Sequence, residues 1–191
     1  MNKGDQIMNS SKNSKELYAE VLKYLKGEYG VVTDSDKKTA FEKCKKAADA
    51  DYVPAKNLLA VFYLIGYGTE INQEATLGYF VLNDEDSGDL AVYNIGVAKI
   101  QRNGIEGSWE SAQYFEKWAN QLRNYKLAKL MFKMRDHLAG ELYATESNMG
   151  ELMWLLTMKS SYCFLDVDGT IKWINSKGCL SESANKGFNR L

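Results

Sequence analysis

The sequence predicts an all-α protein built as a stack of helical hairpins, and three observations lead to this expectation. The chain of 191 residues contains a single proline, Pro54, and its apolar residues recur at helical spacing through most of its length. The segments that begin at Ala55 and Ala91 resemble each other at an offset of 36 residues, and Gly68 and Gly104 are also 36 residues apart. A period of this length is typical of stacked supersecondary units, each of which buries its apolar face against the next.

The expected elements follow from the N-terminus onward. Residues 1–13 are polar and are expected to be flexible, and residues 14–160 hold the repeats. Each period has an apolar helix, such as "AKNLLAVFYLIGYGTEI", then a glycine-containing turn, then a second helix with small and aromatic residues, such as "ESAQYFEKWANQL". A further copy begins at Ala128, 37 residues after Ala91. The repeated alanines allow close approach of neighbouring helices, and the repeated glycines permit a positive φ in the turns.

Residues 161–191 are expected to form a C-terminal cap, and two interpretations of its secondary structure stay open. The flanks "SYCFLDV" and "TIKWIN" are rich in β-branched and aromatic residues, and the Asp-Gly pair between them favours a type I′ hairpin turn. The competing interpretation is one more decayed repeat helix, because Ile171, Trp173 and Ile174 resemble the aromatic part of the repeat.

One part of the repeat region is close to a known family. The segment "DKKTAFEKCKKAADADYVPAKNLLAVFYLIGYGTE", Asp36 to Glu70, resembles the Sel-like repeat family, which is related to the tetratricopeptide solenoids. The matching positions are Ala40, Ala47, Ala48, Ala55, Leu59, Tyr63, Gly66 and Gly68, and the next copy keeps Ala91, Ile95, Gly96, Gly104, Ala112, Tyr114 and Phe115. The resemblance covers about Glu16 to Ser160 and fades at both ends. It implies a right-handed α/α solenoid of about four helix pairs that serves as a protein-interaction module.

A second resemblance is confined to one short motif. The stretch "FLDVDGT", Phe164 to Thr170, resembles the nucleophile motif of the haloacid-dehalogenase-like phosphatases, in which most of the catalytic domain follows the motif. Only 21 residues follow Thr170. His137 is the only histidine, and neither a histidine-cysteine ligand cluster nor a serine elbow accompanies it. We therefore expect no enzyme activity, no metal and no cofactor, with a phosphatase as a remote alternative.

Composition narrows the class of partner. The net charge of -1 gives no overall basic field for nucleic acid. The longest near-continuous apolar run, "LLAVFYLIG", has about half of the ~20 residues that a membrane helix needs. The N-terminus lacks the apolar core of a secretory signal, so we expect a cytoplasmic protein. Its three cysteines, which lack metal-site spacing, are expected to be reduced.

Two groups of residues are candidates for contact with a protein partner. The first comprises lysines and tyrosines of the first helices, expected on the inner curve of the solenoid: Lys56, Tyr63, Tyr93, Lys99, Tyr125 and Lys129. For Tyr63, a repeat-signature position, core packing is the competing interpretation. The second is an acidic turn that either binds a basic partner or is simply solvated: Asp84, Glu85, Asp86 and Asp89.

The expected function is a non-enzymatic protein–protein interaction module. Its most concrete form is a small bacterial immunity protein that binds and inhibits a cognate toxin, which follows from the small size, the missing catalytic residues and the family resemblance. The alternative is an adaptor or scaffold subunit of a signalling or secretion assembly. The oligomeric state is left open.

Overall fold

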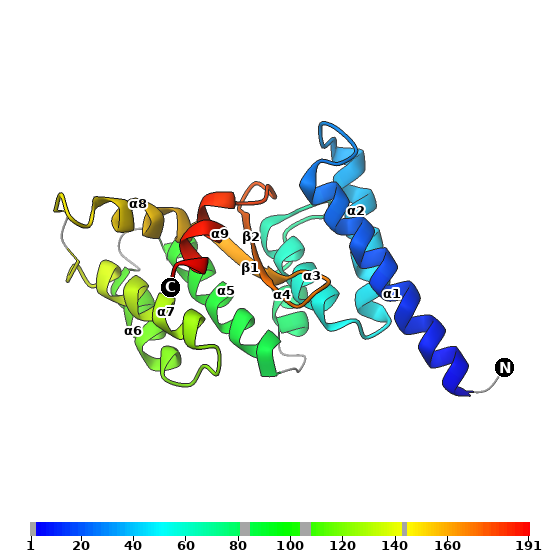
Figure 1. Cartoon of the computed structure of the whole chain (residues 1–191), viewed down its shortest axis with the longest axis horizontal. Coiled ribbons are helices and arrows are strands. Elements are labelled where there is room, and N and C mark those ends of the chain that lie inside the picture. The colour runs from blue at the N-terminus through cyan, green and yellow to red at the C-terminus, as the bar shows by residue number, and fades with distance from the viewer. Residues whose placement is uncertain (1–2, 81–84, 104–107, 143–144) are drawn as a thin grey trace.

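The computed structural model describes residues 3–80, 85–103, 108–142 and 145–191. This part of the chain is mostly helical, as the sequence predicts, and it carries a small antiparallel sheet of two strands (Figure 1). The helices are α1 (Lys3–Lys26), α2 (Asp34–Asp49), α3 (Val53–Ile65), α4 (Gln73–Phe80), α5 (Glu85–Asn103), α6 (Ser108–Ala119), α7 (Tyr125–Leu138), α8 (Met149–Met158) and α9 (Glu182–Asn189). The strands are β1 (Ser161–Leu165) and β2 (Ile171–Asn175).

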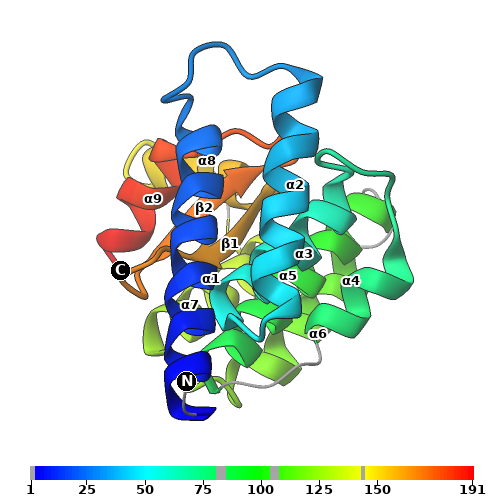
Figure 2. The same ribbon diagram turned by 90° about the vertical axis from the view of Figure 1, so that its right-hand side faces the viewer.

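Helices that follow one another in the chain pack side by side. Helix α1 packs on α2, α2 on α3 and α3 on α4, and the same relation links α5, α6 and α7. Figure 2, seen from the N-terminal end, shows α1 and α2 next to each other in front of the other helices. Two of the repeated alanines, Ala55 and Ala91, are buried as their expected role in close packing requires, and Ala128 is half-buried. Helix α1 begins at Lys3 and thus extends into residues 1–13, the segment that was expected to be flexible.

Local signals in the sequence set the helix ends. Thr33 and Asp36 form a reciprocal capping box at the start of α2. Pro54 lies in the first turn of α3, where its missing amide proton is not needed, and Gly66 ends this helix in the left-handed conformation. Gly68 has a φ of 68°, and a Cβ there would overlap the carbonyl group of Lys37. The turn therefore needs glycine at position 68, whereas its repeat counterpart at position 104 lies outside the described residues.

Two interpretations were open for residues 161–191, and the structure has a hairpin over the first part and helix α9 over the last part. Ser161 pairs with Asn175 and Leu165 with Ile171. The turn is not the expected type I′, because that turn needs a positive φ at two central residues and in this loop only Gly169 has one, at 80°. Instead the amide of Gly169 donates to the carbonyl oxygen of Asp166 at 3.1 Å, the pattern of a three-residue loop with a glycine bulge. Helix α9 follows the hairpin.

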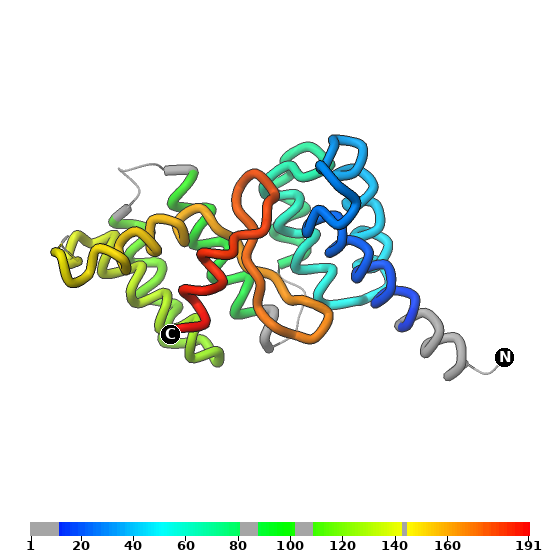
Figure 3. The backbone as a smooth tube through the Cα atoms, turned by 45° about the horizontal axis from the view of Figure 1, so that its top comes forward, coloured from blue at the N-terminus to red at the C-terminus, as the bar shows by residue number. Residues whose placement is uncertain are grey.

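The hairpin and α9 lie along the stack of helices, against the middle of it (Figures 1 and 3). Strand β1 packs on α3 and α5, and α9 packs on α8 and β2. Trp173 of β2 is 1% exposed and meets the rings of Tyr93 and Phe188 edge-on, with centroids 5.2 and 5.1 Å apart. The C-terminal segment thus shares one apolar core with the helices.

Candidate functional site

The faces of α1, α3 and α5 that meet the C-terminal hairpin are covered by the chain itself. We call the surface of α1, α3 and α5 beneath β1 the docking face. Asn94 of α5, which is fully buried, holds β1 through two hydrogen bonds. Its amide nitrogen donates to the carbonyl oxygen of Cys163 and its amide oxygen accepts from the Cys163 backbone amide, both at 2.8 Å. One side chain thus gives the free edge of β1 the two bonds that a neighbouring strand would give.

Two buried tyrosines hold the chain on either side of β1, one at the last residue of β1 and one at the last residue of α8. The hydroxyl of Tyr18 on α1 donates to the carbonyl oxygen of Leu165, and that of Tyr93 on α5 donates to the carbonyl oxygen of Met158 at 3.1 Å. Burial raises the pKa of both tyrosines well above its usual value, because the charged form loses its hydration. Both hydroxyls are therefore neutral donors at physiological pH. Gln101 adds a hydrogen bond to the carbonyl oxygen of Lys159 at 3.3 Å.

One of the residues predicted to contact a partner lies in the docking face and is part of the core. Tyr93, expected where a partner could reach it, is a core residue that lies against Trp173. Tyr63 is half-buried between Phe41 and Tyr79, at centroid distances of 5.2 and 5.9 Å, which agrees with the core interpretation of this position. Neither ring presents a free face to solvent in the way that a binding tyrosine would.

The lysines in the first group are spread over separate surfaces. Lys56 forms an ion pair of 2.5 Å with Asp51 and, mainly through this hydrogen bond, lowers the pKa of that carboxyl group. Lys129 donates to the carbonyl oxygen of Leu191 at 3.3 Å. Lys99 is exposed, with its ammonium group 5.6 Å from the centre of the Tyr114 ring. Only Lys99 remains open to a partner.

The remaining predicted residues do not form one patch either. Tyr125 is 73% exposed at the start of α7. Asp89 is 6% exposed, and its carboxylate accepts a hydrogen bond of 2.6 Å from the backbone amide of Asn124, which fixes the start of α7 against α5. Asp84 lies outside the described residues. Glu85 and Asp86 begin α5, and their side chains lie outside the described part. The acidic run in the sequence thus includes one inward, structural carboxylate.

The motif "FLDVDGT" forms the end of β1 and the hairpin turn. The carboxylate of Asp166 accepts from the backbone amide of Val167 at 2.7 Å, and that of Asp168 accepts from the amide and hydroxyl of Thr170 at 2.9 and 2.7 Å. The Thr170 hydrogen bonds lower the pKa of Asp168. The sheet in the described part of the chain is a single antiparallel pair, whereas the phosphatase motif ends a strand of a parallel sheet. These two aspartates shape the turn.

His137 and the potential metal ligands form no site that the structure reveals. Burial, followed by the nearby charge of Lys159, lowers the pKa of His137, so the imidazole is neutral at physiological pH. Among the residues with described positions, no three histidine, cysteine, aspartate or glutamate side chains are placed to hold a metal ion together.

An open apolar groove lies between α4 and α5, and sequence reasoning did not find it. We call it the outer groove; it has a volume of about 480 Å³ and includes Lys99 at its edge. Its apolar lining is Leu64, Ile71, Leu77, Phe80, Ile95, Ala98 and the ring of Tyr162. Ile71 is 65% exposed and Leu77 is 53% exposed. Helix α4 buries Thr76 and Phe80 and leaves Leu77 exposed, which becomes visible only in the folded structure.

Comparison with other proteins does not assign this chain to a family. In the part of the chain that the structure describes, no helix is both long and apolar enough to cross a membrane. Searches against family models, curated proteins and solved structures found no match to this chain.

Proposed function

We propose that this protein is a non-enzymatic protein-interaction module, built as a short right-handed α/α solenoid of about four helix pairs. Its most concrete form is a bacterial immunity protein that binds and inhibits a cognate toxin. The observation that carries the proposal is the outer groove, where apolar side chains line a concave surface beside an exposed lysine. Contiguous exposed apolar patches are uncommon on soluble monomers, and where they occur they mark interaction sites.

The outer groove is a better binding surface than the docking face. To expose the docking face, the protein would have to uncover side chains that are almost completely buried: Tyr162, Cys163, Phe164, Trp173, Ile174 and Phe188. Burial of one large apolar side chain contributes about 1.5 to 3 kcal/mol, so release of this set would cost about as much as the stability of a whole domain. A partner that binds the outer groove meets no such cost, because Ile71 and Leu77 are already in contact with solvent.

The chemistry of the groove suggests what its partner presents. Leu77 and Ile71 offer exposed apolar contact in the lining of the groove, and Lys99 of the same lining offers one positive charge. A partner segment with two or three apolar side chains and an adjacent carboxylate would complement this surface, with the charge acting mainly on the rate of association.

A second apolar surface favours an adaptor as the alternative. Helix α8 buries one side through Leu152, Leu155 and Met158. Its other side exposes Met149, Met153 and Leu156, which are spaced by one and two helical turns. Two separate apolar surfaces would let one module hold two partners, as a scaffold subunit does.

The proposal is tested by Leu77→Asp, which places a charge in the outer groove, with Met153→Asp as the matched control on α8. Each variant is co-expressed with the toxin encoded by the neighbouring gene, and growth is measured. We expect the wild type and Met153→Asp to protect the cell and Leu77→Asp to fail, at equal soluble amounts of protein. Toxicity that persists with folded wild type would refute the immunity role, and loss of protection in both variants would favour the adaptor.

A further inference from the structure

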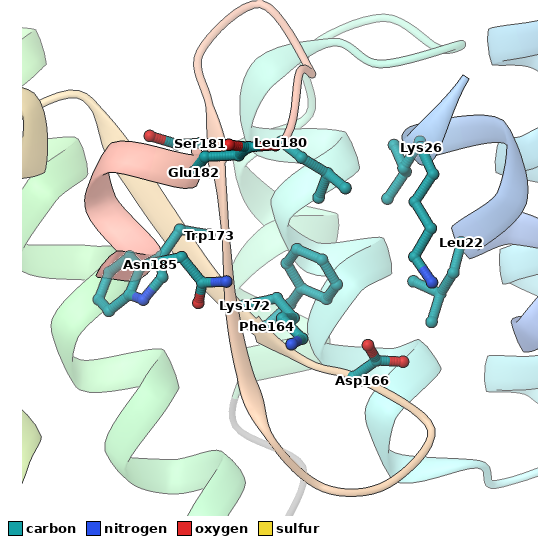
Figure 4. Close-up of a pocket in the computed structure, with 11 residues that line it drawn as sticks. Leu22, Lys26, Phe164, Asp166, Lys172, Trp173, Leu180, Ser181, Glu182 and Asn185 are labelled. Carbon is teal, nitrogen blue, oxygen red and sulfur yellow. The ribbon is translucent and has the colours of Figure 1, made fainter. Parts of the chain in front are cut away.

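A second cavity lies where the C-terminal segment meets α1, away from the outer groove (Figure 4). We call it the seam cavity; it has a volume of about 240 Å³. Its walls come from the last turns of α1, from both strands of the hairpin and from the first turn of α9, and Figure 4 shows these segments facing one another. Segments at opposite ends of the sequence thus build one small site.

Apolar side chains form much of the cavity wall. Leu22 and Leu25 of α1 are buried, as is Phe164 of β1, and Leu180 lies before α9 on another side of the cavity. The volume is below the range of about 300 to 1,000 Å³ that is typical of pockets for drug-sized ligands. A ligand that fits here is therefore small and partly apolar.

Charged side chains also line the seam cavity. Lys26 of α1 and Lys172 of β2 line it, and neither ammonium group has an ion pair or hydrogen bond among the described residues. Asp166 lines it as well, and its carboxylate accepts only the bond from the neighbouring Val167 amide. In Figure 4 Lys26 extends from α1, Asp166 lies below its end, and Lys172 lies beside Phe164, so three segments contribute charged groups to the cavity wall.

The fourth charged residue of the lining, Glu182, does not balance the two lysines. Its carboxylate pairs with Lys186 of the same helix at 3.6 Å, and its side chain is 85% exposed. Lys26 is exposed to solvent, and the charge of Lys172 also acts on the carboxylate of Asp168. Besides Glu182, the cavity is thus lined by two positive groups and one negative group. A ligand that satisfies all three carries a carboxylate for the lysines and an ammonium group for the aspartate.

We propose that the seam cavity binds a small α-amino acid with an apolar side chain. The carboxylate lies between Lys26 and Lys172, the ammonium group faces Asp166, and the side chain packs against Leu22 and Phe164. Charge-assisted hydrogen bonds fix the polar end, and the buried apolar wall selects the side chain. Because α1 and the C-terminal segment each supply part of the site, binding also stabilises their contact.

L-Leucine is the probe, and its binding to the full-length protein is measured by isothermal titration calorimetry and by the shift in thermal unfolding. Two analogues each remove one charge: leucinamide lacks the carboxylate and 4-methylpentanoate lacks the ammonium group. We expect each analogue to bind at least tenfold more weakly than leucine, and glycine, which lacks the apolar side chain, to bind more weakly too. Absence of leucine binding at millimolar concentration, or equal binding of leucinamide, would overturn the proposal.

Protein variants place the binding in the seam cavity. Lys26→Met and Lys172→Met are each expected to weaken leucine binding at least tenfold, whereas Lys38→Met, an exposed lysine on α2, leaves it unchanged. In Asp166→Asn the preference for leucine over 4-methylpentanoate is expected to shrink, because the ammonium group loses its partner. Unchanged binding in both Lys26→Met and Lys172→Met, or an equal loss in Lys38→Met, would show that leucine binds elsewhere.

Discussion

Replacement of Asn94 by leucine removes the side chain that completes the free edge of β1. In the wild type its amide forms both hydrogen bonds with Cys163 inside the core. Asn94→Leu has a similar shape but leaves the backbone amide and carbonyl of Cys163 without partners in a site that excludes water. Each unpaired buried group costs about 1 to 3 kcal/mol, and since the leucine recovers some apolar contact we expect a total loss of about 2 to 4 kcal/mol.

The loss is measured as the free energy of unfolding in urea, followed by circular dichroism and by tryptophan fluorescence. The matched control is Asn120→Leu in the turn directly after α6, where the asparagine is exposed and its amide makes one weak bond of 3.4 Å to a backbone carbonyl. Its unfolding free energy is expected to stay within about 0.5 kcal/mol of the wild type. A loss below about 1 kcal/mol for Asn94→Leu, with an unchanged urea dependence, would refute the argument that this side chain holds the strand.

Three further predictions concern the turn, the pH dependence and the thiols. Gly68→Ala is expected to destabilise the protein by more than about 1 kcal/mol in urea unfolding, because both the positive φ and the nearby carbonyl oppose a Cβ; an unchanged midpoint would contradict this. Burial raises the pKa of Tyr67 to about 12 in the folded protein, above its ordinary value of about 10. The neutral hydroxyl therefore contributes stability below about pH 10, and this contribution is lost as the pH rises toward 12. In thermal unfolding between these pH values, Tyr67→Phe should lose less stability than the wild type. A thiol reagent should label Cys179 quickly and the buried Cys44 and Cys163 only on unfolding, since burial raises the pKa of both; fast labelling of three thiols in the native protein would disprove it.

The helices could be predicted from the sequence because their signals are local. Each helix and its turn lie within one period, and Ala55 and Ala91 hold the same position in successive copies. The structure buries both alanines in helices and gives Gly68 a positive φ. The hairpin was indicated by the β-branched and aromatic flanks of the turn, but only as one of two interpretations that the sequence left open. Its turn type was not, because the bulge depends on the hydrogen bonds of Asp166 and Thr170 across the loop.

The position of the hairpin could not be predicted, because it depends on pairs that are far apart in the sequence. In the sequence Asn94 is an ordinary polar residue of an expected helix. Only the position of β1 in the folded structure shows that its buried side chain bonds to Cys163. Asp89 belongs to an acidic run, yet its carboxylate faces inward to Asn124. The same limit applies to the outer groove, since exposure of Leu77 depends on how α4 meets α5. The periodicity of the sequence identifies which residues share a helix face, but tertiary packing determines which segment covers that face.

The hydrogen bond from Tyr18 to Leu165 has a consequence for synthesis of the chain. A linear array of repeats can fold by local propagation as it leaves the ribosome, because each unit needs only its neighbour. Here the apolar surface of α1, α3 and α5 is covered by the hairpin at residues 161–175, which is synthesised after all three helices. Until that segment emerges, the nascent helices expose this surface, which makes them a substrate for chaperones and a risk for aggregation.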